Sequence, residues 1–196
     1  MPQLIAPTVR VQTSFLQAMA EFQAEGRGAD EDGSAVGREI RKYADRWHDP
    51  AVFAEYTAWL RSMTDEEVFG PLGYVPCDNL WYVEGDTYLG RLGLRHRLND
   101  FLYEYGGHIG YDVRPTARRR GHATAMLRAA LLYAHREVGI DPVLVTCDDT
   151  NTASRRVIEA CGGVFEDQRE AKLRYWIHAA AGSEAQGGAA HGAVGP

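Results

Sequence analysis

The sequence predicts a mixed α/β fold in which helices come first and a β-sheet with a strand–helix–strand unit follows. Apolar residues recur at helical spacing through much of the first third of the chain. From Asn79 onward, aromatic and β-branched runs alternate with turn residues, as they do in strands. Between His108 and Cys147 a strand, a helix and another strand follow one another, which is the βαβ pattern.

The length and composition fit one folded domain. The chain has 196 residues, of which 45% are hydrophobic, and this is ordinary for a protein with a single core. We expect one domain over 1–178, made of a helical part over 1–78 and a core over 79–178. The segment 179–196 is mostly Ala, Gly and Ser, so we expect it to be a disordered tail.

Charge and cysteine content exclude several classes of function. The formal net charge of −6 argues against a nucleic-acid partner, because phosphate binding needs clustered cations. No apolar run is long enough to span a bilayer and the first residues do not resemble a signal peptide, so we expect a cytoplasmic protein without a membrane partner. Cys77, Cys147 and Cys161 lack metal-like spacing, so we expect reduced packing residues and no metal site.

Two helices are predicted in the N-terminal part, over 14–25 and 50–63. Between them, the acidic residues and glycines of 29–34 predict a mobile loop. The apolar residues at helical spacing are Phe15, Met19 and Phe22 in the first helix, and Val52, Phe53, Tyr56, Trp59 and Leu60 in the second.

The core is predicted to contain a hairpin, the βαβ unit, a further helix and two final strands. Pro115 ends a strand because proline cannot donate to a sheet ladder, and glycines end both helices. In chain order we expect a hairpin over 80–98 turning at Gly85-Asp86, a strand over 108–113, a helix with Leu127, Leu131 and Val138 on one face, a strand over 143–147, a helix over 151–161, and strands over 164–165 and 173–177.

The loop that follows the strand over 108–113 has the character of an anion site. The first amides of a helix lack partners within that helix and attract anions. Gly121 and Ala123 leave room for phosphate oxygens beside the backbone, and the three arginines of 118–120 add positive charge. The alternative is an ordinary solvated run of arginines.

The same residues resemble the Q/R-x-x-G-x-G/A motif of the GNAT N-acetyltransferases, with Arg118, Gly121 and Ala123 at its defined positions. A second element, 151–154 followed by 161–165, is similar to the family's N-x-x-A/S helix and the glycine-rich segment that ends it. The resemblance covers about half the chain, from the hairpin to the last strand. It implies the GNAT fold: a central twisted, mostly antiparallel sheet with a βαβ cofactor unit, here preceded by extra helices.

The resemblance implies acetyl-CoA as cosubstrate and no metal. In the family, the backbone of the strand ahead of the motif bonds the pantetheine arm, and the loop with the helix start holds the pyrophosphate. An asparagine at the start of the second helix can cap that helix and hold the cofactor. The residues implied in cofactor binding are Tyr111, Asp112, Val113, Arg118, Arg119, Arg120, Gly121, His122, Ala123, Thr124, Asn151 and Ser154.

The proton donor for the leaving thiolate departs from the family pattern. Many members use a tyrosine seven residues after the motif asparagine, but that position is Ile158 here. The resemblance implies Ser154 as the replacement, by analogy with relatives that carry a serine at this position. Alternatively, Ser154 is only a small helix residue near the cofactor, and a water molecule donates the proton.

The general base is not fixed by the resemblance. Glu104, His108, Asp112 and Glu84 all lie on elements that could face the acceptor, and we select Glu104 and His108 as catalytic candidates. Alternatively, His108 is a strand residue bonded to a neighbour and Glu104 is a solvated loop carboxylate, with a water chain serving as the base.

The acceptor is predicted to be a primary amine on a small, cationic molecule, with an aminoglycoside-type antibiotic as one candidate. The aromatic and polar segment 95–107 is either acceptor-site lining or a structural turn, and parts of it look like a bacterial subgroup of predicted acetyltransferases. Two alternatives remain: a protein or peptide amine, which needs an open groove, and a non-catalytic acyl-CoA-binding module. Relatives often form homodimers, and the sequence leaves the oligomeric state open.

Overall fold

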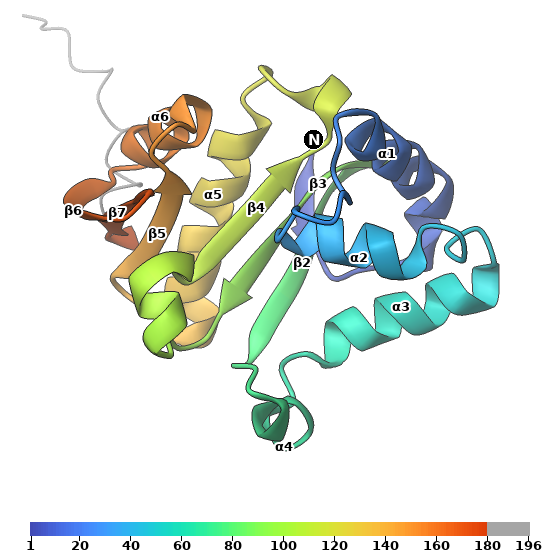
Figure 1. The fold of residues 1–196 in the computed structure, drawn as a ribbon, viewed down its shortest axis with the longest axis horizontal. Coiled ribbons are helices and arrows are strands. Elements are labelled where there is room, and N and C mark those ends of the chain that lie inside the picture. The colour runs from blue at the N-terminus through green and yellow to red at the C-terminus, as the bar shows by residue number, and fades with distance from the viewer. Residues whose placement is uncertain (180–196) are drawn as a thin grey trace, which may run out of the picture.

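The computed structural model describes residues 1–179, which form one seven-stranded sheet flanked by helices (Figure 1). The strand order is β1-β2-β3-β4-β5-β7-β6, and every neighbouring pair is antiparallel except β4 with β5. The predicted mixed, mostly antiparallel sheet with one βαβ unit is therefore confirmed. The strands are β1 (Gln3–Ile5), β2 (Cys77–Glu84), β3 (Thr87–Arg95), β4 (Ile109–Val113), β5 (Val143–Asp148), β6 (Val164–Arg169) and β7 (Lys172–Ile177).

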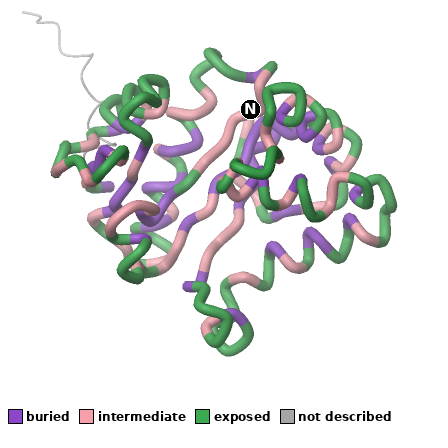
Figure 2. The backbone as a smooth tube through the Cα atoms, in the orientation of Figure 1, coloured by how far each residue is buried: buried purple, intermediate pink, exposed green. Residues whose placement is uncertain are grey.

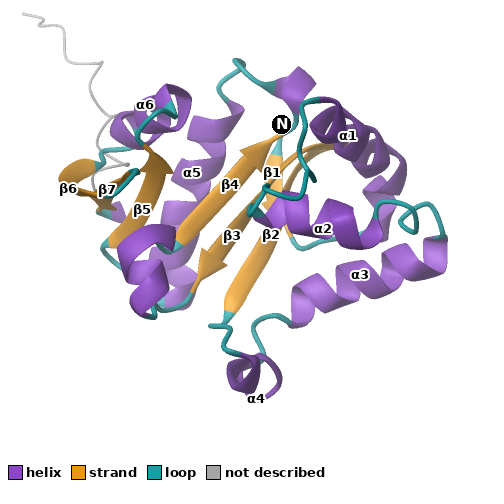
Figure 3. Ribbon diagram, viewed as in Figure 1, coloured by secondary structure: helices purple, strands orange, loops and turns teal. Residues whose placement is uncertain are grey.

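Helices cover both faces of the sheet, with α5 behind it and α1 to α3 in front (Figure 3). Ser34 begins α2 by accepting a hydrogen bond from the amide of Gly37, and Asp49 caps α3 ahead of Pro50. The helices are η1 (Val9–Val11), α1 (Gln12–Ala24), α2 (Ala35–Tyr43), α3 (Pro50–Ser62), α4 (Glu66–Phe69), η2 (Gly70–Leu72), η3 (Leu102–Gly106), η4 (Pro115–Ala117), α5 (His122–Tyr133), η5 (Ala134–Val138) and α6 (Thr152–Ala160).

Two apolar clusters, one on each face of the sheet, hold these layers together. Alternate residues of β4, namely Ile109, Tyr111 and Val113, belong to the cluster under α5. The other cluster packs α1 to α3 against β2 and β3, and in it the rings of Phe15 and Trp81 stack with centroids 5.1 Å apart. Buried residues follow the central strands and the inner sides of the helices (Figure 2).

Strands β4 and β5 separate soon after they meet. They pair at a single register position, Ile109 with Val145, although β4 continues to Val113 and β5 to Asp148. The C-terminal ends of the two strands point apart in Figure 1. Beyond this position their inner edges do not pair with each other, and an unpaired strand edge is where an extended ligand can add.

The elements that the sequence analysis did not predict include β1, α2, α4 and η3. Four of the nine residues of α2 are charged, which concealed its apolar face. The helices predicted over 14–25 and 50–63 are confirmed as α1 and α3, and the predicted hairpin, βαβ unit and final helix are also present. The loop over 29–34 is tied down by Asp32, which accepts hydrogen bonds from Arg27 and from the amide of Ser34.

The predicted tail over 179–196 lies outside the described residues except for Ala179, which is buried and donates its amide to Asp141. All three cysteines are free; Cys147 and Cys161 are buried, whereas Cys77 is half-buried. Within residues 1–179, no helix has the length and apolar character needed to cross a membrane, and no cluster of three or more metal-binding side chains occurs.

Candidate functional site

The start of α5 has the backbone geometry of an anion site. Gly121 caps the helix with a φ of 81°, a left-handed conformation that glycine adopts without strain, and the space beside its Cα is open. Within the described residues 1–179, the backbone amides from Arg119 to Thr124 have no hydrogen-bond partner. Unpaired amides in the first turn of a helix attract phosphate oxygens. The predicted loop, with His122 and Ala123 at the helix start, therefore suits a pyrophosphate.

The three arginines of this loop have different partners. Arg118 forms an ion pair with Glu25, with an N–O distance of 2.8 Å, and donates to the carbonyl of Val113. It thus fastens the loop to α1. Arg119 and Arg120 are exposed and have no carboxylate partner in the part of the chain that the structure describes. These two cations therefore remain available to an anion at this helix end.

Ser154, the predicted proton donor, meets a second hydroxyl beside the gap between β4 and β5. Its backbone amide donates to the side-chain oxygen of Asn151, the cap of α6, at 3.0 Å. Its hydroxyl lies 2.9 Å from the hydroxyl of Tyr111 on β4. Burial raises the pKa of Tyr111 to about 12, so this phenol keeps its proton at neutral pH. The sequence analysis predicted Tyr111 only as a backbone contact to the cofactor.

One cavity of about 1220 Å³ reaches from this pair of hydroxyls to α2. Between its two ends, Gly93 and Gly110 lie opposite each other on β3 and β4 and form a floor without side chains. We call the two ends the α6 end and the α2 end. The α6 end is lined by Tyr111, Cys147, Asn151 and Ser154, and the α2 end by Arg38, Glu39, Lys42, Tyr43, Trp59, Tyr74, Arg91 and Arg95.

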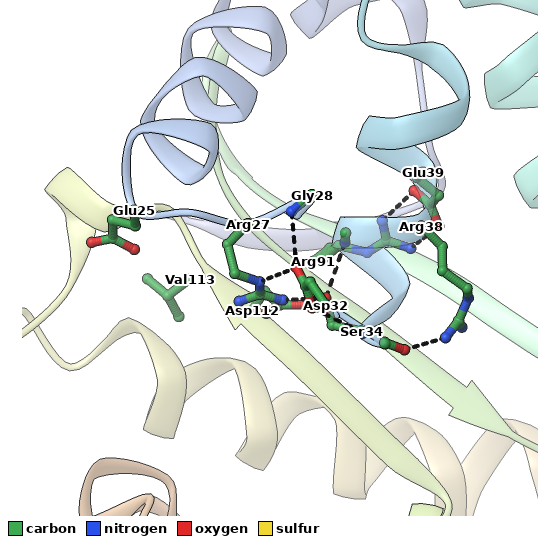
Figure 4. A network of polar contacts seen from close by, with 12 residues as sticks. Glu25, Arg27, Gly28, Asp32, Ser34, Arg38, Glu39, Arg91, Asp112 and Val113 are labelled. Atoms are coloured by element: carbon green, nitrogen blue, oxygen red, sulfur yellow. Dashed lines mark hydrogen bonds and ion pairs between the residues drawn. The ribbon is translucent and has the colours of Figure 1, made fainter. Parts of the chain in front are cut away.

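Ion pairs neutralise most of the carboxylates that line the cavity. Arg27 donates to Asp32 at 3.0 Å and to Asp112 at 3.1 Å, as Figure 4 shows. Burial alone would raise the pKa of Asp32, but hydrogen bonds from the Ser34 side chain, from two backbone amides and from Arg27 outweigh it and hold that pKa well below its usual range. Asp32 is therefore a paired anion at neutral pH.

A second ion pair lies under α2, on the sheet side of the cavity. Arg91 on β3 donates through two nitrogens to Glu39 on α2, at 2.5 and 2.9 Å, and the hydroxyl of Tyr56 on α3 donates to the same carboxylate at 2.5 Å. Burial lowers the pKa of Arg91, but the negative charge of Glu39 outweighs this and raises it. The Arg91 and Glu39 side chains are only 7% and 12% exposed, so this pair joins β3, α2 and α3 almost out of solvent.

Neither predicted general base is among the residues that line the cavity. Glu104 lies on η3 and pairs with Arg169 of β6, although its neighbours Leu102, Tyr105 and Gly106 line the cavity. His108 is buried, and its Nδ1 accepts a hydrogen bond from the amide of Leu144 at 2.9 Å. Both residues are thus held in structural contacts away from the Tyr111–Ser154 pair, and Asp112 is the candidate from the same set that does line the cavity.

The stability of the fold is expected to depend on the protonation of His108. Burial, with the nearby charge of Arg95, lowers the pKa of this imidazole from 6.5 to about 4. The unfolded chain therefore binds the proton more readily, so the stabilisation is complete above about pH 6.5 and is lost as the pH falls towards 4. A shift of this size corresponds to at most roughly 3 kcal/mol. Urea unfolding at pH 7 and pH 4.5 measures it.

A His108→Asn variant is expected to show a flatter dependence of unfolding free energy on pH than the parent. Asparagine keeps an acceptor oxygen for the Leu144 amide but has no titrating group. His48→Asn is the matched control, because His48 is exposed and its loss should leave the pH dependence unchanged. Parallel pH curves for the parent and His108→Asn would show that this imidazole does not cause the acid loss.

The sequence analysis missed the residues that α2 and its preceding loop bring to the cavity, above all Arg27, Arg38 and Glu39. A signal was present: the capping residue Ser34 is followed by Val36 and Ile40 at helical spacing, and both are buried. The segment 95–107, which we expected to be either acceptor-site lining or a structural turn, contributes the following residues to the cavity: Arg95, Asn99, Phe101, Leu102, Tyr105 and Gly106.

Comparisons with known proteins agree with this geometry. The family model described as an acetyltransferase (GNAT) domain matches residues 32–164, a stretch that includes α2. RimJ of Mycobacterium smegmatis, solved with a CoA-disulfide, is similar with a TM-score of 0.61 and 18% identity over 95% of this chain and 84% of that chain. Ribosomal-protein-S5-alanine acetyltransferase from Vibrio fischeri gives a TM-score of 0.61 and 11% identity over 90% and 91%.

The microcin C7 self-immunity acetyltransferase MccE, solved with acetyl-CoA and AMP, gives a TM-score of 0.59 and 13% identity over 90% of this chain and 92% of that chain. A search of curated proteins gave no significant match. At these identities the solved structures show a shared fold, whereas the family model covers more than half of the sequence. The chain therefore belongs to the GNAT acetyltransferase family and is an acetyl-CoA-dependent acetyltransferase.

Proposed function

We propose that this enzyme transfers the acetyl group of acetyl-CoA to a primary amine of a small molecule that binds in the cavity. The observation that carries the proposal is the continuity of that cavity, which joins the hydroxyls of Tyr111 and Ser154 to the walls formed by α2 and α3. Two reactants held in one such space react with a large advantage from proximity.

The residues that would hold acetyl-CoA match its parts. The unpaired amides of 119–124, together with the side chains of Arg119 and Arg120, suit the pyrophosphate. The edge of β4 beyond Ile109 suits the amide groups of the pantetheine arm, which can add to it like a strand. Asn151 keeps Ser154 in place by capping α6. When bound, acetyl-CoA supplies an activated thioester.

We assign the proton transfer to the leaving sulfur to Ser154, supported by Tyr111. The serine hydroxyl can give its proton to the sulfur and recover one from the phenol that lies 2.9 Å away. Because burial raises the pKa of Tyr111 to about 12, the phenol holds a proton throughout the neutral range. A serine supported in this way can replace the tyrosine that is absent at Ile158.

The attacking amine must lose a proton, and Asp112 is the carboxylate best placed to receive it. Asp112 follows Tyr111 on β4 and lines the cavity; its Oδ1 accepts a hydrogen bond from Arg27, and its other oxygen has no hydrogen-bond partner within residues 1–179. A carboxylate can take the proton directly or through water. Glu104 and His108 are less well placed, because neither lines the cavity.

The charge distribution gives little support to the cationic acceptor predicted from the sequence. A cationic amine would favour free carboxylates in the pocket, but Asp32 and Asp112 are paired with Arg27, and Glu39 is paired with Arg91. An aminoglycoside, which carries several positive charges, would meet arginines at the α2 end. A cationic acceptor such as an aminoglycoside therefore stays a prediction, to be tested with the other amines of the panel.

A second candidate function is acetylation of a peptide amino terminus. The Vibrio fischeri structure, whose fold resembles this one over 90% of the chain, is named as an acetyltransferase for an alanine of ribosomal protein S5. A peptide would need to enter through the side of the cavity near Tyr74 and Phe101, which are exposed aromatic residues on its lining.

An amine panel is expected to identify a small-molecule acceptor. Purified enzyme is mixed with acetyl-CoA and with amino acids, phosphorylated amines, polyamines, aminoglycosides or peptides that begin with alanine or serine, and the release of free coenzyme A thiol is measured. Turnover of small amines well above the background hydrolysis supports the proposal. Turnover confined to peptides would transfer the assignment to the second candidate, and no turnover with any amine would overturn both.

A further inference from the structure

The α2 end of the cavity holds more positive than negative charge. Arg38, Lys42 and Arg95 line it and have no carboxylate partner among residues 1–179. Of the carboxylates that line the whole cavity, only that of Glu31 is without a basic partner in the same residues; Asp148, for example, pairs with Lys172. Arg38 and Lys42 are exposed at the mouth of the cavity and Arg95 is half-buried, and an excess of cations facing one cavity favours an anionic ligand.

Arg95 reaches the floor of the cavity beside β4. It is half-buried, and one terminal nitrogen donates to the carbonyls of Gly106 and Gly107 at 3.2 and 3.1 Å. A Cβ added to Gly110 would lie 3.9 Å from both terminal nitrogens of Arg95. The guanidinium therefore lies over the bare floor of the cavity, one residue along β4 from Tyr111.

Arg38 brings a second guanidinium towards the same region. Figure 4 shows its side chain directed away from the Glu39–Arg91 pair and towards the loop before α2, where it donates to the carbonyl of Gly33. Burial lowers the pKa of Arg95, and the positive charge of Arg38 lowers it further. Two like charges that face one cavity repel each other unless an anion lies between them.

The rest of the α2 end suits the body of a small ligand. The ammonium of Lys42 lies 4.9 Å from the centre of the Tyr43 ring and 5.5 Å from that of Trp59. These rings line the same cavity, so they offer apolar surface beside the cations. A planar guanidinium binds a carboxylate or a phosphate through two parallel hydrogen bonds.

We propose that the acceptor is an anionic amine whose carboxylate or phosphate group binds between Arg38 and Arg95, with its primary amine directed towards the gap between β4 and β5. This inference rests on the proposed function, because it names the class of substrate for that same site. It replaces the cationic acceptor expected from the overall composition by one chosen from the charges that face the cavity.

Matched pairs of amines test the proposal. Tyrosine is compared with tyramine, and phosphoethanolamine with ethanolamine, in the assay of coenzyme A release. In at least one pair, the anionic amine is expected to have a kcat/KM roughly 10-fold or more above that of the amine without the anion. A hydrogen bond to a charged group has about this effect. Turnover that favours the member without the anion in both pairs would overturn the anionic class while leaving the acetyltransferase proposal intact. Absence of turnover in the whole amine panel would overturn the proposed function itself.

Variants of Arg38 separate recognition from folding. Arg38→Gln is expected to raise KM for the anionic amine roughly 10-fold, with little effect on the amine that lacks the anion. Arg38→Glu should reverse the preference, and a gain of activity towards tyramine cannot come from misfolding. Arg46→Gln is the matched control, because Arg46 is exposed and does not line the cavity. If Arg38→Gln and Arg46→Gln behave alike towards both members of each pair, the anion does not bind at Arg38.

Discussion

Replacing Ser154 by alanine is expected to lower kcat roughly 100-fold while leaving KM for acetyl-CoA nearly unchanged. The hydroxyl that is removed lies 2.9 Å from the Tyr111 hydroxyl and lines the cavity at its α6 end. Its backbone amide still donates to the side-chain oxygen of Asn151, so α6 and the binding of the cofactor should persist. The measurement is the steady-state release of coenzyme A, with single-turnover rates to show that chemistry limits the reaction.

The companion variant Tyr111→Phe distinguishes a proton relay from a local effect on packing. If Tyr111 acts through Ser154, its loss should have a smaller effect on kcat, and the double variant should be no slower than Ser154→Ala alone. Thr152→Ala is the matched control, since Thr152 is an exposed residue of the same helix. A Ser154→Ala enzyme with the full rate under chemistry-limited conditions would exclude this serine as the donor and leave water in that role.

The parts of the site that could be predicted from the sequence are those built from neighbouring residues. The loop before α5 is one example, because a glycine cap and the unpaired amides beside it are properties of a single short segment. The hydrogen bond from the Ser154 amide to the Asn151 side chain is another, because donor and acceptor are only three positions apart. Helix caps and unpaired amides can be predicted from a few consecutive residues.

Contacts between distant segments left no such pattern. The hydroxyls of Tyr111 and Ser154 are 43 positions apart in the sequence. They meet only because the fold places β4 beside the start of α6. Arg27 reaches Asp112 across 85 positions and also pairs with Asp32, one of the acidic residues from which a mobile loop was predicted. Charge counted along the chain cannot show which charges neutralise each other inside a cavity.

Replacing Glu39 by alanine is expected to destabilise the fold by about 3–5 kcal/mol, the usual cost of leaving a buried charge without its partner. Arg91 would keep its charge at 7% exposure, with no other carboxylate paired to it among the described residues. The hydroxyl of Tyr56 would also lose its acceptor. For a chain of 196 residues this corresponds to a fall in Tm of roughly 6–20 °C, which thermal unfolding measures.

The double variant Glu39→Leu with Arg91→Met decides whether the loss comes from the unpaired charge or from the loss of packing. Apolar residues of similar size remove both charges at once, so the double variant should be more stable than Glu39→Ala. Glu55→Ala, an exposed change on α3, should stay within about 0.5 kcal/mol of the parent. If Glu39→Ala unfolds at the same temperature as Glu55→Ala, then packing alone, without this ion pair, holds α2 against the sheet. The position of Arg38 over the cavity would then owe nothing to the Glu39–Arg91 pair.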